Sequence, residues 1–234
     1  MSGGSAARLG MDEVVVDELE PGLWQITINR PAKRNCLSIV TRDAMSDALD
    51  ALAVRSELKA VVITGAPPVF SAGFDLREFE QAASDPSLNE RIWSSSNRWH
   101  EALRTFPLPL IASVNGPALA GGFDLATMCD LRICSESAVF GRPEVGFAVP
   151  IYSIVRDLLG GALARELAFT DRRIGAAEAL RLGLVSQVVP DADLTEATRT
   201  WARQVLAAPV EGLRHSKAMA IRGAKLAAEA ELVW

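Results

Sequence analysis

The sequence predicts an α/β fold, and three observations carry this prediction. Two continuous apolar runs, Lys59 to Gly65 and Leu108 to Val114, are typical of strands that are buried on both faces. Segments with apolar residues at helical spacing lie between and after these runs. The chain has 234 residues, of which 49% are hydrophobic, so it can bury a large core as one compact unit. Strands that alternate with helices indicate an α/β architecture.

The N-terminal part predicts a tail followed by sheet. Met1 to Gly10 is small and polar, so we expect a frayed tail and neither a signal peptide nor a membrane anchor. Glu13 to Leu19 and Leu23 to Asn29 carry β-branched and alternating residues around a Pro-Gly turn, which is the pattern of a hairpin. The basic loop at 30–35 is ordinarily a solvated turn. A helix is expected from Ser38 to Arg55, with Ser38 or Thr41 as its N-cap.

Two glycine-containing turns each join a predicted strand to a predicted helix. The first is Ser71 to Asp75, and a helical stretch follows it through Trp93 to Leu103. The second follows Val114 and ends in a Gly-Gly pair, Gly121 and Gly122, which opens a short helix. The first N–H groups of a helix have no partner within the helix, and they can bind an oxyanion. Glycine lacks a Cβ atom, so it lets the oxyanion approach these groups closely. A glycine turn that only packs a helix closely on a strand fits the second stretch equally well.

The remaining chain continues the alternation. Strands are expected at Leu131 to Ile133, Val139 to Phe140 and Leu184 to Val189, and helices at about Tyr152 to Thr170, at Ala176 to Leu182 and onward to the end. We therefore expect a flexible tail at 1–10, a core at 11–190 and a helical C-terminal region at 191–234.

Composition excludes several classes of function. The net charge of −5 argues against nucleic acid as a partner. Every apolar run is broken too early to span a membrane, so we expect no membrane partner. The three cysteines, Cys36, Cys129 and Cys134, have no zinc or redox spacing. Reduced thiols of this kind favour a cytoplasmic location.

Motifs exclude further classes. No Lys-Ser/Thr follows the glycine turn, so it is not a nucleoside-triphosphate loop, and no dinucleotide Gly-x-Gly-x-x-Gly occurs. A serine hydrolase would need a nucleophile elbow and a partner histidine, yet no Gly-x-Ser-x-Gly occurs. The two histidines, His100 and His215, are interpreted as helix-surface or packing residues. No ligand cluster indicates a metal site.

The residues of the two turns and one carboxylate can carry chemistry. If the turns converge, the N–H of Phe74 and an N–H of the Gly-Gly turn can stabilise negative charge on one carbonyl oxygen, at about 3 kcal/mol per donor. Glu144 is flanked by apolar and small residues, and such a setting raises a carboxyl pKa.

Four linked motifs resemble the enoyl-CoA hydratase/isomerase (crotonase) family. They are Ile26–Ser38 (ITINRPAKRNCLS), Phe70–Leu76 (FSAGFDL), Asn115–Ala126 (NGPALAGGFDLA) with Cys129-Asp130, and Phe140–Glu144 (FGRPE). The resemblance covers about Val14 to Val189. It implies a spiral of ββα turns with C-terminal helices, assembled as a homotrimer or hexamer. It also implies an acyl-CoA thioester as substrate, stabilisation of an enolate and no cofactor.

The resemblance also assigns residues. The thioester oxygen would lie between the N–H groups of Phe74 and Gly121. The residues that match the CoA path of relatives are Arg34, Ala72, Asp75 and Arg77. Lys217 resembles a late lysine that often approaches CoA phosphates, and a solvated helix lysine is an equal alternative.

Glu144 matches the catalytic glutamate of the family, and Asp124 matches the second acid of the hydratases. The pair suggests addition of water to a 2-enoyl-CoA, with Glu144 exchanging the α-proton and Asp124 holding and activating water. For Asp124 the alternative is a carboxylate that caps its own helix. An isomerase that uses Glu144 alone, or a catalytically weak acyl-CoA-binding protein, are the alternative functions.

The chain departs from the family pattern in three places. Asp124 is one methylene shorter than the hydratase glutamate. The segment after Glu144 is about one residue shorter than in relatives, so we expect a reshaped acyl pocket. The sequence ends at Trp234, before the helical tail of many relatives, and this leaves the geometry of the oligomer open.

Overall fold

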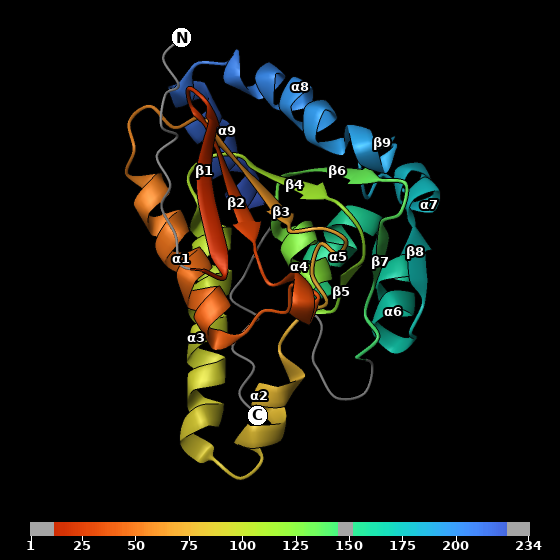
Figure 1. Ribbon diagram of the computed structural model, residues 1–234. Helices are drawn as coiled ribbons and strands as arrows, with labels where there is room; N and C mark the ends of the chain where they lie inside the picture. The colour runs from red at the N-terminus through yellow and green to blue at the C-terminus, as the bar shows by residue number, and fades with distance from the viewer. Residues whose placement is uncertain (1–11, 145–151, 224–234) are drawn as a thin grey trace.

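The computed structural model describes residues 12–144 and 152–223, and it is built on a six-stranded sheet (Figure 1). The strand order is β1-β2-β3-β4-β6-β9. Their bounds are β1 Val14–Glu20, β2 Leu23–Ile28, β3 Ala60–Gly65, β4 Leu110–Val114, β6 Leu131–Ser135 and β9 Gln187–Val189. The β1–β2 hairpin is antiparallel and the other pairs are parallel. The expected α/β fold class is therefore confirmed.

A second, three-stranded sheet has the order β5-β7-β8. Its strands are β5 Ala118–Leu119, β7 Val139–Gly141 and β8 Arg173–Gly175. β5 and β8 are absent from the sequence expectation, because β5 lies within the second glycine turn and β8 has a single apolar residue, Ile174. This small sheet carries the second glycine turn and the segment that leads to Glu144.

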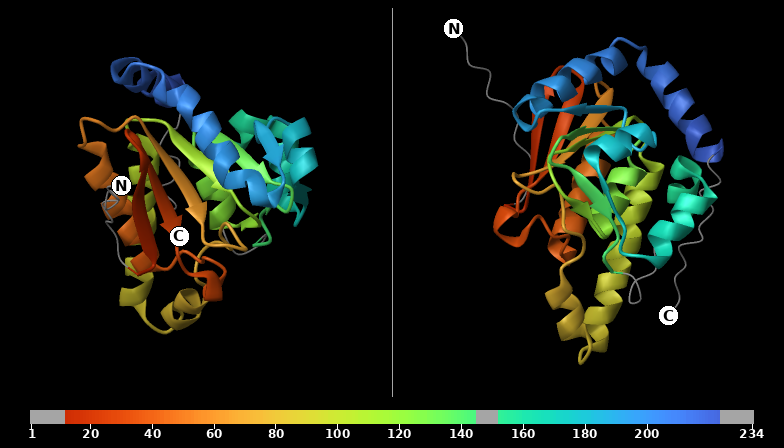
Figure 2. Two further views of the ribbon diagram at one scale, coloured as in Figure 1. Left: turned by 45° about the horizontal axis from the view of Figure 1, so that its top comes forward. Right: turned by 90° about the vertical axis from the view of Figure 1, so that its right-hand side faces the viewer.

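The helices cover both faces of the large sheet (Figures 1 and 2). Alternate residues of β3 enter two cores: Val61 and Ile63 pack in the main core, whereas Ala60 and Val62 pack in a smaller one with Ala202 of α8. The α-helices are α1 Ile39–Ala53, α2 Leu76–Ala82, α3 Pro86–Thr105, α4 Gly121–Met128, α5 Tyr152–Leu159, α6 Gly161–Phe169, α7 Ala176–Arg181, α8 Leu194–Leu206 and α9 Val210–Gly223.

Local chemistry explains where several helices begin and end. Ser38, not Thr41, is the N-cap of α1, because its side-chain oxygen accepts from the Thr41 N–H at 3.2 Å. The single helix expected from Tyr152 to Thr170 is two helices. Gly160, with φ of +78°, separates α5 from α6.

Two further expectations need correction or lie outside the description. The basic loop is only partly a solvated turn: Lys33 and Arg34 are exposed, but Arg30 is paired with Glu13 at 3.1 Å and Asp75 at 3.3 Å. Residues 1–11, 145–151 and 224–234 lie outside the described residues. They include the expected tail, the segment after Glu144 and the end of the expected helical C-terminal region.

The three cysteines are buried free thiols, in agreement with the sequence. Over residues 12–144 and 152–223, no helix is long and apolar enough to cross a membrane, and no group of His, Cys, Asp and Glu could hold a metal ion.

Candidate active site

The two glycine turns lie side by side, although about 45 residues of sequence separate them. Ser71 forms an isolated parallel bridge with Ala118. The Ser71 N–H donates to Pro117 O at 3.1 Å, and the Leu119 N–H donates to Ser71 O at 2.9 Å. On the other side of β5, the Ala120 N–H donates to Gly141 O at 2.9 Å. Backbone hydrogen bonds therefore fix the first turn, the second turn and the Phe140–Glu144 motif against one another.

Three glycines allow this close approach. A Cβ atom on Gly73, where φ is +90°, would lie 2.6 Å from Ala120 Cβ and 2.9 Å from the amide nitrogen of Gly121. A Cβ on Gly121 would lie 2.8 Å from Phe74 Cδ1, and one on Gly122 would lie 2.3 Å from Ser71 O. Real Cβ atoms do not approach this closely, so a side chain at any of the three would displace the turns.

The two N–H groups that the sequence singles out lie on the two adjacent turns. Among the described residues, neither the Phe74 N–H nor the Gly121 N–H donates to a protein acceptor. Gly121 is the first residue of α4, whose N-cap, Ala120, has φ of +52° and offers no side-chain cap. The positive end of the helix and an uncapped N–H thus face the Phe74 turn. The convergence favours an oxyanion site over a purely structural glycine turn.

The Phe74 side chain is held from behind by α1 and α3. The Arg42 guanidinium carbon lies 4.3 Å from the centroid of the Phe74 ring, and the Trp99 ring meets it edge-on at 6.1 Å. Arg42 is fully buried and donates to Leu37 O at 2.6 Å and to Ile92 O at 3.2 Å. Burial lowers the pKa of Arg42 to about 10, so its guanidinium stays charged at neutral pH.

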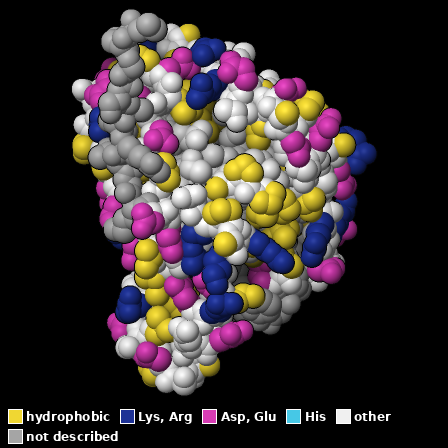
Figure 3. Space-filling view, viewed as in Figure 1, with side chains coloured by type: hydrophobic (Ala, Val, Ile, Leu, Met, Phe, Trp, Pro, Cys, Tyr) yellow, Lys and Arg dark blue, Asp and Glu magenta, His cyan; other side chains and the backbone are white. Residues whose placement is uncertain are grey.

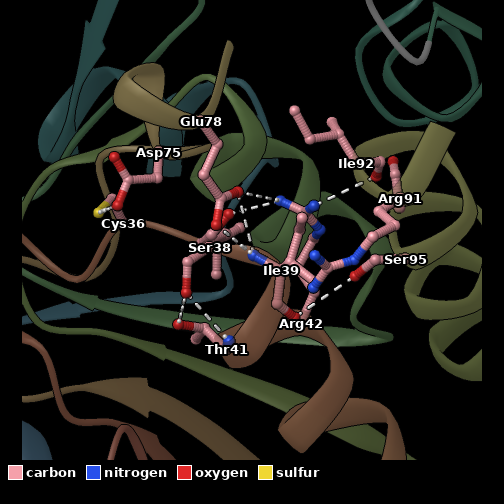
Figure 4. A network of polar contacts seen from close by, with 12 residues as sticks. Cys36, Ser38, Ile39, Thr41, Arg42, Asp75, Glu78, Arg91, Ile92 and Ser95 are labelled. Atoms are coloured by element: carbon pink, nitrogen blue, oxygen red, sulfur yellow. Dashed lines mark hydrogen bonds and ion pairs between the residues drawn. The ribbon is translucent and has the colours of Figure 1, made fainter. Parts of the chain in front are cut away.

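The same network connects α1 to α2 (Figure 4). Glu78 accepts the Ile39 N–H with both carboxylate oxygens, at 3.0 and 3.1 Å, and lies 4.0 Å from the Arg42 guanidinium. Because Glu78 lies four residues after Phe74, this contact also ties the helix that follows the first turn to the body of the protein.

Asp124 and Glu144 both face one guanidinium, that of Arg142. Arg142 Nη2 is hydrogen-bonded to Asp124 Oδ1, and Arg142 Nη1 lies 4.0 Å from Glu144 Oε1. The Arg142 side chain is only 4% exposed, and each carboxylate side chain retains 12%. Glu144 Oε2 is buried and has no hydrogen-bond partner among residues 12–144 and 152–223. The site thus holds one carboxylate paired with a cation and one with a free oxygen.

Burial dominates the protonation of both acids. Burial raises the pKa of Asp124, and the Arg142 charge opposes that rise. Burial likewise raises the pKa of Glu144. A hydrogen bond from its own backbone N–H and the Arg142 charge oppose that rise, and the neighbouring Asp124 adds to it. A raised pKa favours a carboxyl as a general acid or base.

These contacts correct one interpretation and add one residue. Asp124 does not cap its own helix, because its carboxylate is paired with Arg142. Arg142 was missed as a site residue. Its only signal in the sequence is its place two residues before Glu144, where β7 ends.

The chain matches the family model described as enoyl-CoA hydratase/isomerase over residues 18–233. The chain belongs to this family. A hydroxycinnamoyl-CoA hydratase-lyase of Pseudomonas fluorescens is 34% identical over 204 residues, which are 84% of this chain and 74% of that protein.

Solved structures show the same crotonase fold. An enoyl-CoA hydratase from Bacillus anthracis superimposes with a TM-score of 0.85 at 30% identity, over 93% of this chain and 86% of that one. A monofunctional enoyl-CoA isomerase from M. smegmatis superimposes with a TM-score of 0.79 at 29% identity, over 94% and 97%. Relatives of this chain therefore include both a hydratase and an isomerase.

The residues that match the CoA path of this family cluster near the first turn. The Ala72 N–H donates to Arg34 O at 3.0 Å, and the side chains of Arg34 and Arg77 are exposed. Figure 3 shows Lys and Arg side chains gathered over this part of the surface, below the large sheet. Asp75 differs from the others: it caps α2 and accepts from Cys36 Sγ and Arg30, each at 3.3 Å. Its carboxylate is therefore occupied by protein donors.

Lys217 is buried and paired within the protein. Its Nζ is paired with Asp130 at 2.6 and 2.7 Å, and the residue is 7% exposed. Lys217 is therefore not a solvated helix lysine. It joins α9 to the end of α4, where it lines a cavity of about 180 Å³ with Met128 and Ile221.

Proposed function

We propose that this member of the enoyl-CoA hydratase/isomerase family adds water to a 2-enoyl-CoA thioester. The observation that carries the proposal is the convergence of two unpaired N–H groups, those of Phe74 and Gly121, in the part of the fold that also holds Asp124 and Glu144. An acyl thioester brings together the carbonyl and the acidic α-carbon that such groups act on.

In the proposed reaction, the thioester oxygen accepts both N–H groups. Water attacks the β-carbon while Asp124 accepts a hydrogen bond from it. The water gives one proton to the Glu144 carboxylate, and the electrons of the double bond move onto the thioester oxygen as an enolate. The two N–H donors stabilise that negative charge, each by about 3 kcal/mol. Glu144 then delivers the proton to the α-carbon and returns to its carboxylate form. Its unpaired Oε2 supports this assignment, because a carboxylate oxygen without a protein partner is free to carry the proton.

CoA itself would lie along the exposed basic surface. Arg34 and Arg77 offer charge to its phosphates, whereas Ala72 and Asp75 would contribute backbone atoms, since the Asp75 side chain is occupied. No cofactor is needed, because CoA is part of the substrate. We also expect a homotrimer or hexamer and a cytoplasmic location. Light scattering that gives only the monomer mass would contradict the oligomer.

A second candidate, isomerisation of an enoyl-CoA, is favoured by one observation. Asp124 already holds Arg142, so Glu144 is the acid with an unpaired oxygen. One such acid suffices to move a proton between the α- and γ-carbons.

Asp124→Asn separates the two reactions. We expect the parent protein to hydrate a short 2-enoyl-CoA, and Asp124→Asn to lose hydration while it still exchanges the α-proton of a saturated acyl-CoA with deuterium oxide. Normal hydration by Asp124→Asn would show that the water is activated elsewhere, and isomerisation becomes the better assignment. A parent that binds acyl-CoA but performs neither reaction would support a binding protein.

A further inference from the structure

We propose that Arg142 is a positioning residue that separates the titrations of the two acids: its guanidinium holds the Asp124 carboxylate and favours the ionised form of Asp124 more than that of Glu144. The proposal rests on the proposed function for its chemistry. Its charge arrangement can be measured without any substrate.

The geometry of Arg142 supports this separation. The guanidinium is nearly inaccessible to solvent, is hydrogen-bonded to Asp124 and lies 4.0 Å from the nearer oxygen of Glu144. Its carbon lies 5.6 Å from the centroid of the Phe123 ring, which adjoins Asp124 on α4. The contact with Asp124 is a hydrogen bond, whereas the approach to Glu144 is only an ion pair at the limit of contact. The cation therefore favours the ionised form of Asp124 more than that of Glu144.

Two neighbouring carboxyls without a cation would behave differently. Like charges at close range cannot both ionise, so such a pair shares one proton and either acid can carry it. A guanidinium stays charged in proteins and presents two donor nitrogens in a fixed plane. Arg142 uses one nitrogen on each acid, and it thereby separates their titrations.

Other charged groups of the described chain do not replace Arg142 in this place. On α3, burial lowers the pKa of His100 to about 4, so this imidazole is neutral at pH 7. On α1, the Arg42 guanidinium is engaged by Leu37 O, Ile92 O and Glu78. The charges that act on Glu144 are those of Asp124 on α4 and Arg142 after β7.

The test is a carbon-13 NMR titration of the Glu144 carboxyl in the folded protein, with its resonance assigned by its loss in Glu144→Gln. We expect Arg142→Gln to raise the pKa of Glu144 by about one unit or more, because the cation that opposes protonation of Glu144 is lost. Asp124→Asn should lower that pKa, because Arg142 is then free to pair with Glu144. The Asp124→Asn/Arg142→Gln double variant, which removes both charges, should lie between the two single variants.

Further variants exclude a merely structural effect. Arg142→Lys keeps the charge and should restore most of the parental pKa. Arg203→Gln is the matched control. Arg203 lies on α8 and forms an exposed pair with Glu20 of β1, so this variant should leave the Glu144 titration unchanged. If Arg142→Gln does not fold, the double variant must still show a higher Glu144 pKa than Asp124→Asn does.

Equal Glu144 titration in all variants, or shifts of the same sign in both single variants, would overturn the proposal. The activity readout is separate. In active protein the acidic limb of the pH profile for α-proton exchange should follow the NMR shifts. If the Glu144 titrations shift as expected but the protein shows neither hydration nor α-proton exchange, the role of Arg142 is supported and the proposed function is wrong.

Discussion

Gly73 and Gly121 are packed so closely that a Cβ atom on the first would lie 2.9 Å from the amide nitrogen of the second. The contact joins the residue before one proposed oxyanion donor, Phe74, to the other donor itself. Because both donors sit on turns that this contact locks together, their spacing is set by backbone packing and not by flexible side chains.

Gly73→Ala should therefore damage catalysis more than folding. The added methyl group must push the Gly121 turn away, and we expect kcat/KM to fall by about 10²-fold, the usual effect of losing one oxyanion donor. Gly183→Ala is the matched control, since Gly183 also has a positive φ (+74°) but nothing within 4 Å of an added Cβ. Both variants should lose about 1–2 kcal/mol of stability from backbone strain. Equal activity in the two variants would contradict the role of the contact.

Arg42→Lys should lower both stability and kcat. An ammonium cannot serve Leu37 O and Ile92 O together while it lies over the Phe74 ring, so a buried carbonyl loses its donor at about 1–3 kcal/mol. We expect kcat to fall more than KM rises, because the Phe74 turn shifts. Denaturant unfolding and steady-state kinetics measure these effects. Arg98→Lys, at an exposed pair with Asp47, is the control and should change stability by less than about 0.5 kcal/mol.

Glu144→Gln should stabilise the protein at neutral pH while it abolishes proton exchange. Burial raises the pKa of Glu144, so ionising it costs folding free energy above its folded pKa, and that cost disappears as the pH falls below its ordinary value. We expect a gain of about 1 kcal/mol at about pH 8, typical of a single stabilising substitution, and a smaller gain at about pH 4. Glu90→Gln, at an exposed position of α3, is the control and should change stability by less than about 0.5 kcal/mol. A stability difference that grows toward low pH would contradict the prediction.

Lys217→Met should destabilise the protein without changing the KM for an acyl-CoA. The substitution leaves Asp130 without its cation, and because the Asp130 side chain keeps 27% exposure we expect a loss of about 2 kcal/mol, below the usual range for a fully buried pair. Asp130→Asn should have a similar effect. Arg34→Ala and Arg77→Ala should instead raise KM in a salt-dependent way, because these arginines are exposed. A raised KM in Lys217→Met would place this lysine on the CoA path after all.

Sequence periodicity was sufficient for the large elements of the fold. The runs that became β3 and β4 are buried on both faces, and such strands are recognisable without any partner. β5 and β8 were missed, since β5 lies between the glycines of a turn and β8 has one apolar residue, so neither has an apolar pattern of its own. The split of the Tyr152 to Thr170 helix was missed as well, because Gly160 and Gly161 fit a continuous apolar pattern.

The candidate site, like the fold, was predictable from the sequence only in part. The two glycine turns were recognised because glycine turns after strands have a local signature, and the structure brings these turns together. The donor roles of Phe74 and Gly121 stay predictions. Arg142 had no such signature, since an arginine after a strand looks like a surface residue until the fold places Asp124 against it. Lys217 was misjudged for the same reason: its partner Asp130 is 87 residues away in the sequence.

The proposed function depends most on Glu144, which carries the proton beside a thioester oxygen held by the N–H groups of Phe74 and Gly121. The most direct measurement is deuterium incorporation from heavy water at the α-carbon of a saturated acyl-CoA, by the parent protein and by Glu144→Gln. We predict incorporation by the parent and a loss of at least about 10²-fold in the variant, as expected for a lost general acid–base group. Equal incorporation by the two proteins would contradict the account.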